Sequence, residues 1–180
     1  WDGVRTPLAG LKVNELRTIA VKVAAPAAVG TYTLRYDIVQ EGVAWFSSKG
    51  MQTPTRSVNV TLPAYGATYA VPAAVTAAAG ATTTVPVTIT NTGSLPWLQG
   101  MRINLAYHIW TAAGATFVWD GARTRLPADL PAGQSITVNA TVKAPATAGS
   151  YRLGFDLVQE GTTWFSGQGV PTGNATLTVQ

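Results

Sequence analysis

The sequence predicts an all-β protein built of antiparallel β-sandwiches, without significant helix. Short segments alternate apolar and polar residues with a period of two, as half-buried strands do. Clusters of Gly, Pro, Asn and Asp separate these segments at regular intervals, which favours frequent turns. A third observation is that one long block of sequence occurs twice, which is typical of a tandem array of domains.

The composition supports a buried core and argues against a nucleic-acid partner. The 180 residues are 47% hydrophobic and 11% charged, against about 25% charged in an average soluble domain. A disordered chain shows the opposite balance. The formal net charge is +4, but the basic residues are scattered along the chain rather than clustered. We therefore expect ordinary surface charges and no nucleic acid as partner.

The sequence lacks cysteine, a bilayer-spanning apolar run and an opening signal peptide, and each absence bears on the chemistry or the location of the protein. Cysteine is absent, which excludes disulfides, thiolate catalysis and Cys-based metal sites. No apolar run approaches the roughly 18 residues that span a bilayer, so we expect no membrane span. The sequence does not open with a signal peptide, so in a secreted protein that segment would have been removed or left out.

The internal repeat sets the predicted domain organisation. Residues 31–50 and 150–169 match at 11 of 20 positions without a gap, at an offset of 119. The similarity extends upstream, where Trp1-Asp2-Gly3 corresponds to Trp119-Asp120-Gly121. We predict that residues 64–180 form a complete repeat and that residues 1–63 form only the second half of another. The first strands of that half repeat are missing, or another chain or segment supplies them.

The complete repeat is expected to contain seven or eight short strands. An edge strand around Tyr69 is interrupted by Pro72, a residue that edge strands tolerate. Asp120-Gly121 predicts a tight hairpin, because glycine accepts the positive φ that such a turn needs. The remaining strands are expected near residues 84–90, 102–110, 116–119, 136–142, 151–157, 163–166 and 175–179.

A turn motif points to the immunoglobulin-like version of the sandwich. Gly149-Ser150-Tyr151-Arg152-Leu153 is echoed by Gly30-Thr31-Tyr32-Thr33-Leu34. Both resemble a tyrosine corner, in which a tyrosine hydroxyl bonds to backbone at the turn into a strand. We expect Tyr32 and Tyr151 to play this part, in tandem immunoglobulin-like antiparallel β-sandwiches.

Several motifs together resemble the bacterial immunoglobulin-like domains related to the four-tryptophan domain. The order and spacing of these motifs carry the resemblance, which covers most of residues 85–180 and, in its second half only, residues 1–63. The resemblance implies a β-sandwich used for binding or as a spacer in surface and secreted proteins, without catalytic activity or a fixed ligand. The motifs are Asn91-Thr92-Gly93, Trp97, Pro131-Ala132-Gly133-Gln134, Ala144-Pro145, Gly149-Ser150-Tyr151-Arg152-Leu153 and Trp164-Phe165.

The polar residues predict no enzyme, cofactor or metal site. His108 is the one histidine and has no triad or metal partner at a familiar spacing, so we interpret it as structural. The carboxylates recur as pairs, Asp37 with Glu41 and Asp156 with Glu160. Residues four apart on a strand lie roughly 13 Å apart, beyond the about 5–9.5 Å of a hydrolytic pair. We expect the Asp to bond backbone or an arginine and the Glu to hold the turn.

The aromatic residues are candidates for an interface or for stacking on sugar rings. In Trp45-Phe46 and Trp164-Phe165, adjacent strand residues face opposite sides, so one ring should fill the core and the other should face outward. Trp110 and Trp119 add to this group. Packing is favoured over glycan binding, because buried aromatics dominate sandwich cores.

These observations predict a non-enzymatic, extracellular structural repeat of a bacterial surface or filament-forming protein, as a stalk, fibre or adhesin spacer. A half sandwich exposes apolar faces and strand edges, so neighbouring copies of the repeat are the expected partners, through strand complementation or filament assembly. The alternative is a carbohydrate-binding accessory module of a secreted enzyme, with cell-surface glycans as partners. Aromatics exposed on one sheet face would favour that alternative, and aromatics buried at domain junctions the structural role.

Overall fold

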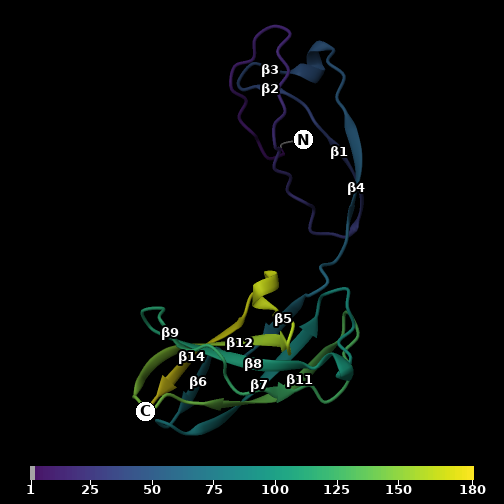
Figure 1. Ribbon diagram of the computed structural model, residues 1–180. Helices are drawn as coiled ribbons and strands as arrows, with labels where there is room; N and C mark the ends of the chain where they lie inside the picture. Colours follow the sequence, from purple (N-terminus) through teal and green to yellow (C-terminus); the bar gives the residue numbers. More distant parts are fainter. Residues whose placement is uncertain (1–2) are drawn as a thin grey trace. The chain divides into compact units, whose positions relative to one another are not determined.

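The computed structural model describes residues 3–180, so residues 1 and 2, which open the predicted first domain, lie outside the described part (Figure 1). The chain divides into two compact units: the first ends at Thr61, and the second runs from Leu62 to Gln180. The boundary lies close to the predicted one at residue 63. Across the described residues the structure is all-β, with fourteen strands and three short 3-10 turns, which confirms the predicted fold class.

The second unit is a sandwich of two sheets. The larger sheet has the order β10-β8-β12-β14-β6, with β9 also on β8 and β13 also on β12, and the smaller has the order β11-β7-β5. Neighbouring strands are antiparallel except β6 and β14, which are parallel. The strands are β5 (Ala67–Ala70), β6 (Ala74–Ala77), β7 (Thr82–Asn91), β8 (Ile103–Thr111), β9 (Thr116–Val118), β10 (Thr124–Arg125), β11 (Ser135–Lys143), β12 (Gly149–Gln159), β13 (Thr163–Trp164) and β14 (Gly173–Val179).

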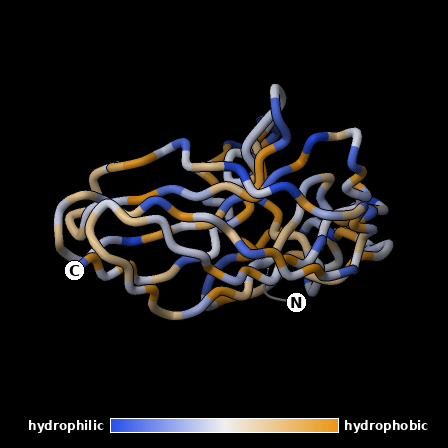
Figure 2. Tube along the Cα trace, turned by 90° about the horizontal axis from the view of Figure 1, so that it is seen from below, coloured by the Kyte–Doolittle hydropathy of each residue, from blue (hydrophilic) through white to orange (hydrophobic). Residues whose placement is uncertain are grey.

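The core lies between the two sheets and follows the period-two pattern. Figure 2 shows polar and apolar residues alternating along the strands. On β7, Val85, Val87 and Ile89 are buried, while Thr88 faces outward and bonds to Thr137 of β11 over 2.7 Å. Burial of the apolar face removes it from water, which is the main favourable term in folding. The largest fully buried side chains of this core are Trp97, Phe155, Phe165, Ile89, Leu105, Ile109, Leu153, Leu157 and Leu177.

Pro72 separates two strands that belong to different sheets. The sequence predicts one interrupted edge strand here, but β5 pairs with β7 in the smaller sheet and β6 pairs with β14 in the larger. Proline has no amide to donate to a ladder, so the chain leaves one sheet at this point and joins the other.

The predicted hairpin at Asp120-Gly121 is wrong. Strands β9 and β10 follow each other along one edge of β8, and the Gly121 amide between them donates to the Tyr107 carbonyl over 3.0 Å. The tight turn lies earlier, where Gly114 has φ of 85°. Gly121 is required for a different reason: a Cβ there would lie 2.5 Å from the Tyr107 carbonyl oxygen.

The first unit reproduces the second half of the sandwich only. Strand β1 (Gly30–Arg35) pairs with β4 (Thr55–Val60), and β2 (Val39–Gln40) pairs with β3 (Ala44–Trp45), which leads into the 3-10 turn η1 (Phe46–Lys49). By the repeat, β1 and β2 correspond to β12, β3 to β13 and β4 to β14. None of residues 3–61 is buried. This unit therefore has strands without a closed core.

Candidate functional site

Three tryptophans surround His108 on the outer face of the larger sheet. Because Ile109 and Tyr107 point into the core, His108 and Trp110 of β8 point outward. The His108 ring stacks on Trp119 at 4.2 Å and 19°, and it lies 4.7 Å from Trp164 and 5.5 Å from Trp110. His108 is fully buried beneath these rings. We call the four residues His108, Trp110, Trp119 and Trp164 the tryptophan face.

Both ring nitrogens of His108 have partners. Nδ1 contacts the Trp119 carbonyl, and Nε2 lies 3.5 Å from Oδ2 of Asp156. Asp156 is fully buried and also accepts from the amides of Leu157, at 2.8 Å, and Ser166, at 3.2 Å. A general base needs a free nitrogen aimed at a nucleophile. Here the histidine instead fastens the segment after β9 to the sheet.

Two arginines cover two of the tryptophans. Arg152 lies over Trp110 at 4.0 Å, and Arg123 lies over Trp164 at 5.0 Å, within the range of a cation–π contact. Arg123 also bonds to Glu160 over 2.7 Å and to Asp120 over 2.5 Å. The hydrogen bond from Arg123 lowers the pKa of Glu160, although partial burial opposes this. Trp119 remains 48% exposed, so it presents the open ring of the tryptophan face.

The same cluster recurs in the first unit, without a histidine. Arg5 bonds to Glu41 over 2.8 Å and lies over Trp45 at 4.8 Å. Asp37 accepts from the amide of Ile38 at 2.8 Å and from the amide and hydroxyl of Ser47. The Ser47 hydroxyl is the main cause that lowers the pKa of Asp37. A hollow of about 380 Å³ is lined by Asp37, Trp45, Ser47 and Ser48, and the counterparts of Asp37 and Trp45 in the second unit, Asp156 and Trp164, contact His108.

The two aromatic pairs behave differently in the two units. Phe165 is fully buried, edge-on to Tyr65 at 5.1 Å and to Trp97 at 5.4 Å, while Trp164 packs against His108 on the outer face. One ring is therefore inside and the other outside, as predicted, but Phe165 follows β13 with helical backbone angles and is not a strand residue. Phe46, the counterpart of Phe165, is 40% exposed. The difference lies in the strands around the ring and not in the pair itself.

The paired carboxylates take their predicted roles only in part. Asp37 and Asp156 bond to backbone, whereas Glu41 and Glu160 bond to arginines. The glutamates therefore do not hold the turns as the sequence predicts. Each partnering arginine comes from a segment more than thirty residues away, so the local sequence does not identify it.

Both tyrosine hydroxyls make the hydrogen bond that a tyrosine corner requires. Tyr151 donates to the Thr147 carbonyl over 3.0 Å, and Tyr32 donates to the Ala28 carbonyl over 2.8 Å. In each case the acceptor lies four residues upstream, in the turn before the strand. The contact is local, so it forms in the first unit although that unit has no closed core.

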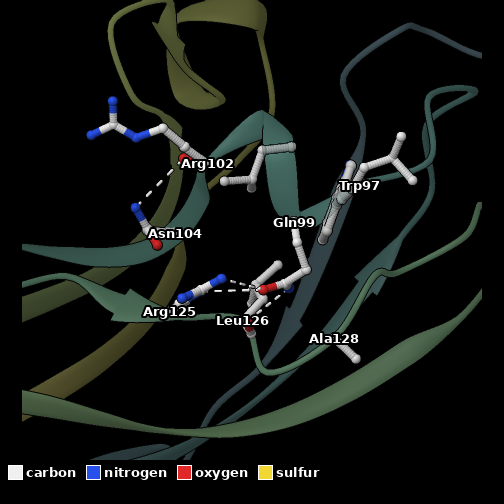
Figure 3. A pocket seen from close by; sticks show the side chains of 9 residues that line it. Trp97, Gln99, Arg102, Asn104, Arg125, Leu126 and Ala128 are labelled. Carbon is white, nitrogen blue, oxygen red and sulfur yellow. Dashed lines mark hydrogen bonds between the residues drawn. The ribbon is translucent and has the colours of Figure 1, made fainter.

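A second hollow, of about 300 Å³, is one that no sequence motif predicts (Figure 3). It lies beside the 3-10 turn η2 (Gln99–Met101) and β10, with Trp97 on one wall. Among residues 3–180, Nε1 of Trp97 is buried without a hydrogen-bond partner. The Gln99 side chain, in contrast, accepts from Arg125 at 2.8 and 3.2 Å and donates to the Leu126 carbonyl at 3.0 Å. These groups brace the turn.

Within residues 3–180, no three His, Asp or Glu side chains come together as a metal site would require. Over the same residues, no helix has the length and apolar character needed to cross a bilayer.

Comparison with known proteins adds little. No protein-family model matches the chain, and no curated protein matches it. Among solved structures, a β-glucosidase from Listeria innocua in complex with glucose is 13% identical over 69% of this chain, with a TM-score of 0.40. The chain spans 17% of the length of that protein. Similarity at this level carries no argument about activity, so the resemblance to four-tryptophan domains stays a prediction.

Proposed function

We propose that this protein is a non-enzymatic structural repeat of a bacterial surface or filament-forming protein, working outside the cell as a stalk, fibre or adhesin spacer. The observation that carries the proposal is the first unit. It repeats the sequence motifs of the second half of the sandwich in the same order, yet none of residues 3–61 is buried. An apolar half sandwich with open strand edges associates with further chain, and copies of the same repeat have the complementary shape.

The organisation of the polar residues supports a structural role. In each unit an arginine joins a glutamate and a tryptophan, and an aspartate joins two backbone amides. Each group in these clusters is used to hold one segment to another. A catalytic site instead presents a group with unused bonding capacity to a substrate.

The test is the mass and shape of the protein isolated from its source. Intact mass spectrometry and negative-stain microscopy should be run on the same preparation. We expect a mass well above 18.8 kDa and elongated particles of repeating subunits, with antibody labelling at the cell surface. A monodisperse compact particle of 18.8 kDa inside the cell would overturn the proposal.

A second candidate function, a carbohydrate-binding module, is favoured by one observation. Trp110, Trp119 and Trp164 gather on one sheet face, and Trp119 is half exposed. A flat aromatic ring can pack against the apolar C–H face of a sugar, and the nearby Arg123 and Arg152 offer hydrogen-bond donors.

This second candidate is tested with the full chain on a glycan array and by affinity electrophoresis in soluble polysaccharides. If it holds, Trp119→Ala abolishes retardation. Phe117→Ala is the matched control, because Phe117 is equally exposed but lies outside the tryptophan face. Absence of any retardation of the unaltered chain, or equal loss in both variants, would remove the candidate.

A further inference from the structure

The first unit contains an apolar segment that pairs with no strand among residues 3–180. Residues 16–24 correspond to β11, which in the second unit pairs with β7 along its whole length. Val138, Ala140 and Val142 of β11 are 7%, 2% and 0% exposed. Their counterparts Ile19, Val21 and Val23 keep the alternation, but they are 40%, 44% and 52% exposed and form no strand.

A second interruption lies where β8 would pair. In the second unit, β12 is continuous over Gly149–Gln159 and pairs with β8 from Tyr151 to Gln159. The matching sequence in the first unit forms β1 and β2 with a gap at residues 36–38. Tyr36 and Ile38, which lie in this gap, are both exposed, whereas their counterparts Phe155 and Leu157 are fully buried. The ladder breaks where backbone groups lack a partner on that side.

The hollow of about 380 Å³ lies beside residues whose counterparts in the second unit contact His108. Its lining residues Asp37 and Trp45 correspond to Asp156 and Trp164, which contact His108 in the second unit. Under the register of β8 on β12, the His108 position lies opposite residue 35. A strand of the β8 type on the first unit would therefore place a histidine-sized side chain in this hollow.

We propose that the first unit is an acceptor for a first-half repeat segment, a polypeptide carrying strands of the β7 and β8 types. The β7-type strand pairs antiparallel with residues 16–24, and the β8-type strand with residues 32–40. The occupant carries apolar residues at its inward positions and a hydrogen-bonding side chain the size of histidine opposite the hollow. This inference deepens the proposed function and rests on it for the source of such segments.

The first unit also requires a different residue from the bound segment at the position that Trp110 takes in the second unit. Trp110 packs directly on Gly154, where a Cβ would lie 2.6 Å from its ring. The residue that corresponds to Gly154 in the first unit is Arg35. An indole in the same place would collide with the Arg35 stem. The occupant therefore carries a small residue where β8 carries Trp110.

The experiment lengthens the full chain by a second copy of residues 62–118 placed before residue 1. Val118 of the added copy then precedes Trp1 as Val118 precedes Trp119 in the natural chain. The added copy carries Trp110→Ala. Hydrogen exchange is followed at the amides of residues 16–24 and 36–38. We expect protection to rise about 100-fold over the unextended chain, as for amides moved from an open to a cooperatively folded region.

Three variants of the added copy test the assignment. Retaining Trp110 in the added copy should reduce the gain in protection. Replacing His108 of the added copy by Ala should also reduce the gain, because Asp37 then has no histidine to contact. Leu105→Asp with Ile109→Asp places charges at inward positions and should abolish the gain. Unchanged exchange at residues 16–24 and 36–38 with the Trp110→Ala copy, while the second unit stays protected, would overturn the inference.

The outcome is separable from that of the proposed function. Protection in the extended chain together with a compact, monodisperse native particle would keep the acceptor and reject the filament or stalk. Elongated native particles without protection in the extended chain would keep the structural role and reject the acceptor.

Discussion

Arg123 donates from Nε to Oε1 of Glu160 over 2.7 Å, joining the segment after β9 to the end of β12. The pair also holds the Arg123 guanidinium over Trp164. The first unit repeats this arrangement between Arg5 and Glu41, so the contact forms from second-half residues alone.

This contact predicts a pH dependence of stability. The pKa of Glu160 is lowered in the folded state, from the ordinary value of 4.5. The stability that ionised Glu160 adds to the second unit is therefore present above this ordinary pKa. It is lost as the pH falls through the pKa that Glu160 has in the folded protein. We expect Glu160→Gln to lower the urea midpoint of the second unit at pH 7 and to make a progressively smaller difference as the pH falls below 4.5. Glu41→Gln is the control and should leave the midpoint of the second unit unchanged. A difference that persists undiminished at pH 3 would contradict this.

The aromatic core predicts a large difference between two equivalent substitutions. Phe165 is fully buried against Tyr65 and Trp97, so Phe165→Ala should destabilise the second unit by about 3–5 kcal/mol. Phe46→Ala, at the same repeat position, should cost less than about 0.5 kcal/mol, because Phe46 is not enclosed. Denaturant unfolding followed by circular dichroism measures both. Equal costs would show that the first unit has a closed core.

A second matched pair concerns glycine. A Cβ on Gly121 would lie 2.5 Å from the Tyr107 carbonyl oxygen, whereas a Cβ on Gly3 meets nothing within 4 Å. We expect Gly121→Ala to push the segment after β9 off β8 and to lower the free energy of unfolding by more than about 1 kcal/mol. Gly3→Ala should be silent. Thermal unfolding of both variants decides the matter, and a silent Gly121→Ala would mean that this backbone contact is not tight.

The tyrosine corner predicts a modest effect with a clear signature. Tyr151→Phe removes the hydrogen bond to the Thr147 carbonyl but keeps the ring against Phe117, 5.7 Å away. We expect a loss of about 1 kcal/mol in the free energy of unfolding. Tyr151→Ala should lose more, because the ring contact goes as well. If the two variants were equally stable, the ring would contribute nothing to the corner.

Much of the second unit could be predicted because its signals are local. Alternation of apolar residues indicates a strand and its buried face, which is why one ring of Trp164-Phe165 was expected inside and the other outside; that Phe165 is the buried ring is decided by the tertiary structure. The tyrosine corner needs only four residues of sequence separation. The contacts around His108 were harder to predict. His108 and Asp156 come from strands 48 residues apart, and neither residue type names its partner.

The two incorrect predictions, the hairpin at Asp120-Gly121 and the single edge strand around Pro72, also concern contacts between residues distant in sequence. Asp120-Gly121 has the composition of a hairpin, but the edge of β8 draws the chain along itself and requires glycine for space. Pro72 correctly marks an interruption, but which sheet receives each side depends on strands far away in the sequence.

The first unit separates the two levels most clearly. Residues 31–50 contain the pattern of a strand, a corner and a tryptophan–phenylalanine pair, and the local parts of that pattern form: β1, the Tyr32 hydrogen bond and the Arg5–Glu41–Trp45 cluster. The continuous strand and the buried phenylalanine form only in the second unit. A strand needs a neighbour to satisfy its backbone groups, and an apolar ring needs an opposite sheet to exclude water. Those partners come from residues distant in sequence, so the same pattern closes a core in one unit and leaves it open in the other.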